Sequence, residues 1–176
     1  MKPPVLLSFE NVLQTPRWWA RRGLFRFENG EEKTYFTIMH RPGAIIVAED
    51  EGRFLMVEQY RLNIERLTLE FPMGSIDPDE EPLAGAKREL LEETGMSAKT
   101  WKPLGKISNA NGSLQSWLHI FAATELSEQG EAQPELGEVG MNHFWATADE
   151  INGWIREGRI HDNKTLAAWS LYLANK

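Results

Sequence analysis

The spacing of apolar residues along the chain predicts a series of short strands. Runs rich in branched and aromatic side chains alternate with turn residues, of which Asn29-Gly30 is the clearest pair. A hairpin is expected around residues 49–52, where two apolar runs flank a polar turn. The predicted strands cover residues 5–13, 22–28, 33–40, 43–48, 53–60, 67–71, 100–108, 116–125 and 141–146.

A helix is expected over residues 82–94, because both of its ends carry clear signals. Pro82 suits the first turn, where its missing N–H has no partner to lose, and Gly95 suits the left-handed position after the last turn. The neighbouring stripe that can pack on a sheet consists of Leu83, Ala86, Leu90 and Thr94.

Two further helices are predicted to close the chain. The first begins with Thr147 and Glu150 in capping-box register, and the second presents Leu166, Trp169 and Leu173 on one face. Strands and helices that interleave in this way predict an α+β fold in which helices sandwich a mixed sheet.

Three acids of the 82–94 helix fall on one face. Glu89, Glu92 and Glu93 stand at i, i+3 and i+4, so their carboxylates should converge. Each like-charge pair should weaken the helix by about 0.2–0.5 kcal/mol, and the Arg88–Glu92 pair offsets this locally. Crowded hard oxygen ligands suit Mg²⁺ or Mn²⁺, which bridge to substrate phosphates. The alternative interpretation is a solvated helix face.

Composition narrows the class of protein. A chain of 176 residues with 41% hydrophobic content can build one sizeable core and a small extra subdomain. The net charge of −7 argues against a nucleic-acid surface, and the absence of cysteine excludes a disulfide framework and a thiol nucleophile. No apolar run approaches a membrane helix, and the first apolar segment is too short for a signal peptide. We therefore expect a cytoplasmic protein with neither nucleic-acid nor membrane partners.

The stretch from the glycine loop through the acidic helix resembles the Nudix box. That motif asks for Gly, five residues, Glu, seven residues, and then Arg-Glu-aliphatic-x-Glu-Glu-x-Gly-aliphatic. The resemblance implies a Nudix-type α/β/α sandwich and a metal-dependent hydrolase of diphosphate bonds. Its positions are filled here by Gly74, Glu80, Arg88, Glu89, Leu90, Glu92, Glu93, Gly95 and Met96.

Three segments that flank the box are similar to the ADP-ribose pyrophosphatase branch of that family. They are Arg41–Val47, Val57–Arg61 and Leu69–Gly74, in the order that the branch uses. This resemblance implies that ADP-ribose is the substrate and that nucleoside monophosphate and sugar phosphate are the products.

The resemblance also implies roles for single residues. A metal would neutralise the diphosphate oxygens and lower the pKa of the attacking water, which makes Glu92 and Glu93 catalytic candidates. Arg88 is expected to orient Glu89 or Glu92, and Glu80 to fix the loop or bind an outer metal. The implied substrate-binding residues are Arg61, Glu70 and Gly74, and the implied metal ligands are Glu89, Glu92, Glu93 and the main-chain carbonyl of Met73.

In similar enzymes a glutamate from a loop after the central sheet acts as the general base. The acidic segment 128–138 offers candidates here. Glu138 sits nearest the expected position and Glu135 is second. A solvated acidic loop with no catalytic role is the alternative interpretation.

Two positions depart from the branch and leave the substrate open. Asn111 stands where the branch often has a proline, and Met73 replaces its alanine before the box glycine. GDP-mannose, NADH and dinucleoside polyphosphates are alternative substrates. A non-catalytic domain that binds nucleotide sugars is the alternative of a different class.

The N-terminal section is too small to bury its own large apolar groups. We divide the chain into a small N-terminal β subdomain, residues 1–40, and a Nudix hydrolase domain, residues 41–176. In the resembling branch the N-terminal sheet is exchanged between two subunits, so a homodimer is expected. The large groups are Trp18, Trp19, Phe25, Phe27, Tyr35 and Phe36.

Overall fold

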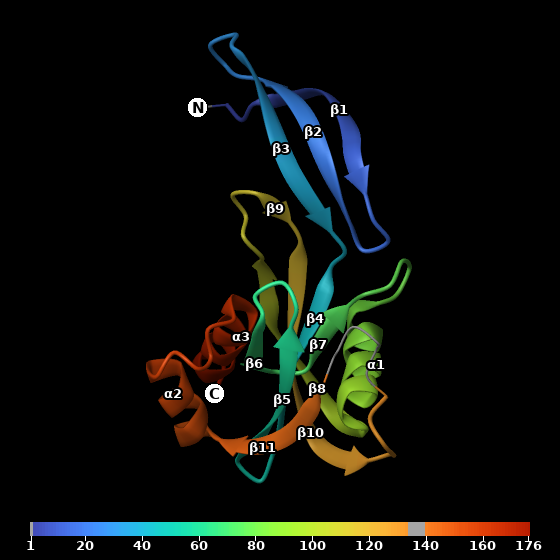
Figure 1. Cartoon of the computed structure of the whole chain (residues 1–176), viewed down its shortest axis with the longest axis vertical. Coiled ribbons are helices and arrows are strands. Elements are labelled where there is room, and N and C mark those ends of the chain that lie inside the picture. The colour runs from blue at the N-terminus through green and yellow to red at the C-terminus, as the bar shows by residue number, and fades with distance from the viewer. Residues whose placement is uncertain (1, 134–139) are drawn as a thin grey trace. The chain divides into compact units, whose positions relative to one another are not determined.

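The computed structural model describes residues 2–133 and 140–176 of the chain (Figure 1). Its helices are α1 (Pro82–Thr94), α2 (Ala148–Arg156) and α3 (Asn163–Ala174). Its strands are β1 (Val5–Gln14), β2 (Trp18–Arg26), β3 (Glu32–His40), β4 (Gly43–Asp50), β5 (Arg53–Arg61), β6 (Arg66–Glu70), β7 (Met73–Ser75), β8 (Met96–Ser108), β9 (Leu114–Gln115), β10 (Trp117–Glu128) and β11 (Asn142–Thr147).

The chain divides into two compact units. The first contains Met1–Pro42 and Ser108–Trp117, and the second contains Gly43–Ile107 and Leu118–Lys176. In the first unit β1, β2 and β3 form an antiparallel meander, and the two-residue strand β9 runs parallel to β3. Segment 108–117, which the sequence analysis counted with the larger domain, therefore belongs to the same unit as the N-terminal strands.

The second unit is built on a mixed sheet with the strand order β11-β5-β4-β10-β8. β10 runs parallel to β4, whereas β5 pairs with β4 in antiparallel fashion at the hairpin end, through Glu49 with Phe54 and Asp50 with Arg53. Further along, β6 pairs with β5 and β7 pairs with β4. The connection between β6 and β7 bonds to the sheet through the Ile46 N–H, which donates to the Pro72 carbonyl at 2.9 Å.

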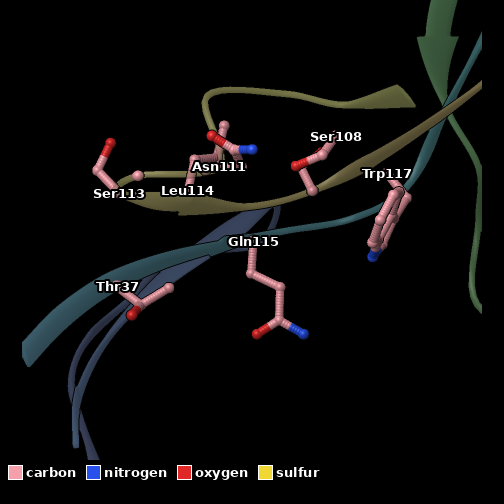
Figure 2. Close-up of a pocket in the computed structure, with 9 residues that line it drawn as sticks. Thr37, Ser108, Asn111, Ser113, Leu114, Gln115 and Trp117 are labelled. Atoms are coloured by element: carbon pink, nitrogen blue, oxygen red, sulfur yellow. The ribbon is translucent and has the colours of Figure 1, made fainter. Parts of the chain in front are cut away.

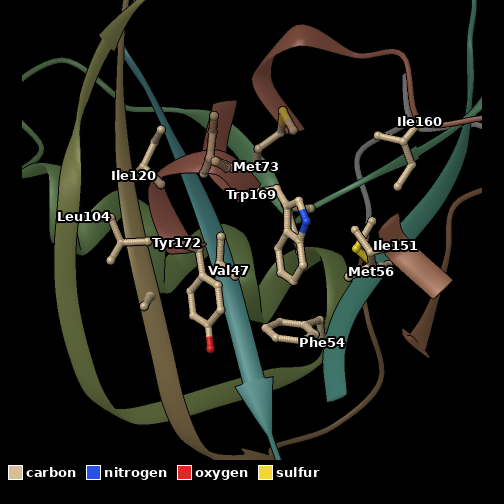
Figure 3. Packing of buried hydrophobic residues seen from close by; sticks show 14 of the residues in the cluster. Val47, Phe54, Met56, Met73, Leu104, Ile120, Ile151, Ile160, Trp169 and Tyr172 are labelled. Atoms are coloured by element: carbon tan, nitrogen blue, oxygen red, sulfur yellow. The ribbon is translucent and has the colours of Figure 1, made fainter. Parts of the chain in front are cut away.

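Helices cover both faces of this sheet because the strand residues of β4 alternate between two hydrophobic clusters. Ile45 and Val47 join the cluster that contains α2 and α3 residues, whereas Ala44, Ile46 and Ala48 join the cluster that contains α1 residues. Figure 3 shows the first cluster, in which the ring centroids of Phe54 and Trp169 are 4.9 Å apart. The predicted α+β class with a mixed sheet between helices is confirmed.

The predicted buried face of α3 needs correction. Leu173 is 46% exposed, and the buried face is formed by Thr165, Ala168, Trp169 and Tyr172. In α1 the predicted Ala86, Leu90 and Thr94 are buried, and only Leu83 in the first turn is exposed. Small and aromatic residues of α3 fit against the sheet, so counting leucines placed part of its stripe one position away from the contact.

The predicted capping box of α2 is present. The Glu150 N–H donates to the Thr147 hydroxyl at 3.2 Å, and the Thr147 N–H donates to the Glu150 carboxylate at 2.8 Å. Among the residues that the structure describes, no helix combines the length and the apolar character needed to cross a membrane.

Candidate active site

The helix α1 has the bounds that its end signals predict. Pro82 occupies its first turn, and Gly95 closes it with φ 70°, its N–H donating to the Leu91 carbonyl at 2.8 Å. A side chain at Gly95 would also collide with the Gly130 carbonyl oxygen, at 2.1 Å from an added Cβ. The chain after β10 therefore packs directly on the end of the acidic helix.

Arg88 lies at the centre of the acidic patch. Its Nη1 donates to Glu89 Oε1 and to Glu92 Oε2, both at 2.8 Å. Its Nε and Nη2 donate to the two oxygens of Glu80 at 3.1 and 3.0 Å. Nη2 also donates to the Ser75 carbonyl at 2.8 Å. One guanidinium thus binds three carboxylates and ties α1 to β7.

These contacts determine the charge states around Arg88. The hydrogen bonds from Arg88 and the Asp77 N–H lower the pKa of Glu80 against a smaller effect of burial. In turn, the bond to Glu80, followed by those to Glu89 and Glu92, raises the pKa of Arg88 although burial opposes this. Arg88 therefore remains a cation and Glu80 remains an anion at neutral pH.

Two of the acids are buried against β7. Met73 donates its N–H to Glu93 Oε2 at 2.9 Å, and a Cβ added to Gly74 would lie 2.1 to 2.2 Å from the carboxylate atoms of Glu89. A side chain at position 74 would therefore push the Glu89 carboxylate out of its place beside Arg88. Glu92, in contrast, is partly exposed to solvent.

A second arginine binds a second buried acid close to this patch. Arg61 donates from Nε to Glu70 Oε1 at 2.7 Å and from Nη2 to Glu70 Oε2 at 2.5 Å. The Thr68 hydroxyl also donates to Glu70 Oε1 at 2.6 Å. Burial by itself would lower the pKa of Arg61, but the bond to Glu70 and the charges of Glu70, Glu93 and Asp162 raise it. Arg61 thus lies within electrostatic range of the box acid Glu93.

In the described part of the chain, no three acidic or histidine side chains converge as a ready set of metal ligands. Glu89 and Glu92 face Arg88, and Glu93 faces the Met73 N–H. The cation that the crowded acids require is therefore Arg88 in this structure. The donors still fit a hard divalent ion chemically, since they are carboxylate oxygens gathered around a glycine that leaves them space.

Two candidate site residues lie outside the described part of the chain, and two residues near the site were not predicted from the sequence. Glu138 and Glu135 fall outside the described residues. The Gln133 N–H donates to the Glu92 carbonyl at 2.7 Å, so Gln133 lies at the acidic helix. Lys164 and Asp162, which adjoin Glu70 and Arg61, were not predicted; a local signal exists only for Asp162, which stands three residues before Thr165 in capping register.

The first unit contains a cavity of about 280 Å³ at the β8–β10 connection. Figure 2 shows its lining, in which the amides and hydroxyls of Asn111, Gln115 and Thr37 are accompanied by the ring of Trp117. The side chains around it are uncharged. Asn111, the departure from the family pattern, is one of these lining residues.

Glu80→Gln is expected to destabilise the protein by about 1 kcal/mol at pH 7, because it removes one carboxylate partner of Arg88. The folded-state pKa of Glu80 lies below its unfolded value. Its contribution is therefore complete above the unfolded pKa of about 4.5 and is lost as the pH falls through the folded-state pKa.

Urea unfolding of the wild type and of Glu80→Gln at pH 7 and pH 3 measures the difference between their free energies of unfolding. This difference should be smaller at pH 3 than at pH 7. Glu81→Gln is the matched control, since Glu81 makes no side-chain cap bond to α1. A gap that stays constant with pH would contradict the assignment of the Arg88–Glu80 pair.

Comparison with known proteins shows the family of the chain. The NUDIX domain family matches residues 39–169. The chain is 32% identical to the ADP-ribose pyrophosphatase of Bacillus subtilis over 133 residues, which cover 74% of this chain and 72% of that protein. It is 32% identical to the ADP-ribose pyrophosphatase of Mycobacterium tuberculosis over 149 residues, covering 84% and 72%.

A third relative carries a different description. The methanol dehydrogenase activator of Bacillus methanolicus is 33% identical over 133 residues, covering 74% of this chain and 72% of that protein. A crystal structure of an ADP compounds hydrolase superposes with a TM-score of 0.85 at 22% identity, covering 99% of this chain and 94% of that one, and thus shares the fold. On these matches the chain belongs to the Nudix family and is a Nudix hydrolase.

Proposed function

We propose that the protein hydrolyses the diphosphate bond of a nucleoside diphosphate sugar, with ADP-ribose as its principal substrate and Mg²⁺ or Mn²⁺ as its cofactor. The observation that carries the proposal is the packing of Glu89 and Glu93 against Met73 and Gly74, within electrostatic range of Arg61. The names of the two pyrophosphatase relatives support the choice of substrate.

The residues that would hold the metal are Glu89, Glu92, Glu93 and the main-chain carbonyl of Met73. A bound divalent cation supplies charge neutralisation at the diphosphate oxygens and a lowered pKa for the attacking water. Arg88 would hold Glu89 and Glu92 in place, since its Nη1 bonds to both. Gly74 would contact the substrate through its main chain, because the place of a side chain there is taken by the Glu89 carboxylate.

Arg61 would bind a phosphate of the substrate. Its Nε–Nη2 edge is taken up by Glu70, and the side chain is 36% exposed. The Nη1 edge therefore remains for an anionic oxygen, which is the geometry in which arginine binds phosphate strongly. In this assignment Glu70 contributes to substrate binding indirectly, because it orients Arg61.

We assign the general base to Glu138, with Glu135 as the second candidate. The bond from the Gln133 N–H to the Glu92 carbonyl supports this assignment, because it holds Gln133, a near neighbour of both candidates in the sequence, on the helix that carries the box acids. A base must come within hydrogen-bonding reach of the attacking water.

A homodimer formed through the N-terminal strands completes the proposal. Support comes from the large apolar side chains that this unit exposes, among them Phe9, Leu13, Phe36 and Ile38. The strand register places Leu13, Phe36 and Ile38 on one face of the sheet, and exposed apolar side chains that gather on one face often mark a contact with another protein.

ADP-ribose should be hydrolysed in the presence of Mg²⁺ or Mn²⁺, and excess chelator should abolish turnover. Glu92→Gln and Glu93→Gln should each lower the rate at least about a hundredfold, because each removes a charged ligand while keeping the side-chain shape. Release of AMP measures the reaction. Glu81→Gln, which makes the same charge change at the start of the same helix, should retain activity.

Hydrolysis that continues in excess chelator would contradict the requirement for a divalent metal. A panel with GDP-mannose, NADH and dinucleoside polyphosphates tests the substrate in the same assay, and a higher kcat/KM for any of them would replace ADP-ribose. Binding of ADP-ribose without hydrolysis of any of these compounds would indicate a non-catalytic domain.

Glu138→Gln should lower kcat by a factor of about 10²–10⁴ with little change in ADP-ribose or metal binding, since a general base acts in the transition state. Glu135→Gln, three residues away in the same segment, is the matched control and should be mild. Full activity of Glu138→Gln would transfer the role to Glu135 or to a box glutamate. Full activity of the double variant would leave the segment without a catalytic role.

Light scattering at micromolar protein should give about twice the chain mass of 20.1 kDa. Phe36→Asp, which places a charge on an exposed apolar side chain of β3, should shift the protein toward the monomer. Phe54→Leu in the core of the other unit should change stability but not assembly. A wild-type mass near 20.1 kDa would refute the homodimer.

A further inference from the structure

Lys164, in the first turn of α3, lies between two acids from different parts of the second unit. Its Nζ is 2.8 Å from Asp162 Oδ1 and 3.7 Å from Glu70 Oε2. The side chain is 21% exposed. A lysine held in this way has lost much of its freedom, so its position is set by the two carboxylates rather than by solvent.

The two oxygens of Asp162 perform different tasks. Oδ2 accepts the Thr165 N–H at 2.9 Å and the Thr165 hydroxyl at 3.0 Å, which caps the start of α3. Oδ1 holds Lys164. Capping therefore accounts for Asp162 and Thr165 but does not require the lysine, whose charge is held by Asp162 Oδ1 within 3.7 Å of Glu70 Oε2.

The buried charge of Glu70 needs compensating positive charges, because the residue is only 1% exposed. Burial would raise the pKa of Glu70, but the hydrogen bond from Arg61 and the charge of Lys164 outweigh it and lower the pKa. Arg61 and Thr68 donate to Oε1, whereas Oε2 receives Arg61 and faces Lys164. Lys164 is thus a second positive charge near Glu70 Oε2. Among the charged contacts described above, this oxygen would otherwise face only Arg61.

The direction of the Arg61 guanidinium follows from the position of this carboxylate. A bidentate pair fixes the plane of the guanidinium, so any rotation of the Glu70 carboxylate is passed on to the Nη1 edge. The four side chains Arg61, Lys164, Glu70 and Asp162 balance two positive against two negative charges. Removing the lysine would leave a net negative charge beside the place where an anionic substrate is expected.

We infer that Lys164 is a positioning residue for substrate binding, which fixes Glu70 so that Arg61 presents its Nη1 edge to the diphosphate. The inference rests on the proposed function, because it requires a nucleoside diphosphate substrate that Arg61 contacts. Lys164 itself does not contact the substrate. Its effect should therefore appear in KM and should vanish when Arg61 is absent.

Lys164→Met in the full chain should raise KM for ADP-ribose about 5- to 20-fold and change kcat less than about threefold, since Arg61 binds the ground state and the transition state alike. Lys164→Arg should restore KM to within about threefold of the wild type. Lys102→Met is the matched control. It removes the same charge from the same unit, where Lys102 bonds to the Asn175 carbonyl, and should leave KM unchanged.

The Arg61→Met background separates the possible roles. There, Lys164→Met should lower kcat/KM by less than about twofold more, because its effect passes through Arg61. A full multiplicative loss would show that the lysine contacts the substrate directly and would overturn the inference. A lower melting temperature with unchanged KM would also overturn it, since it would mean a structural role alone.

Failure of the proposed function can be distinguished from failure of this inference. If the wild type hydrolyses no nucleoside diphosphate compound, the proposed function fails. Calorimetric binding of ADP-ribose in the presence of chelator then compares Lys164→Met with the wild type directly. An equal dissociation constant would overturn the role of Lys164, and one weaker by about 5- to 20-fold would support it.

Discussion

The interaction on which the site depends is the insertion of one guanidinium into a ring of carboxylates. Four glutamates between residues 80 and 93 of the loop and helix would repel one another, and two of them are buried. Arg88 compensates by donating to three of these glutamates, Glu80, Glu89 and Glu92, and to the Ser75 carbonyl. A lysine could not replace it, because a single ammonium cannot reach four acceptors in a plane.

The same contacts explain why the loop before α1 adopts its shape. Glu80 accepts the Asp77 N–H at 2.9 Å as well as Arg88, so the loop is held by the charge that organises the helix. Gly74 then lies against Glu89. The two arginines differ in consequence: Arg88 is surrounded by protein acceptors on every nitrogen, whereas Arg61 has one edge bound and is partly exposed. The first suits structural support and the second suits ligand binding.

Local signals in the sequence were sufficient to predict the ends of an element wherever its own residues determine them. Pro82 and Gly95 fixed both ends of α1, and Thr147 with Glu150 fixed the start of α2. Predictions failed where packing decides. β7 and β9 have three and two residues, which is too short for any period to appear. The face of α3 depends on which side chains fit the sheet, and a count of leucines does not contain that information.

The candidate site shows the same division. The box acids and Arg88 are neighbours on one helix, so their meeting could be predicted from spacing. The contact of Lys164 with Glu70 joins residues far apart in the sequence, and nothing local marks it. Burial of Glu70, Glu89 and Glu93 also cannot be read from a sequence in which glutamate is ordinarily exposed.

Those buried acids mark the candidate site independently of any relative. Each one carries a desolvation penalty that an apolar residue of similar size would avoid, and a buried ion pair is often no more stable than its apolar replacement. A side chain at Gly74 would displace the Glu89 carboxylate, which adds a further restriction at the same place. Stability alone would not concentrate three buried carboxylates, two arginines and this glycine in one region of a fold. The proposed chemistry with an anionic substrate would provide the reason, because it needs fixed charges of both signs that are held out of water.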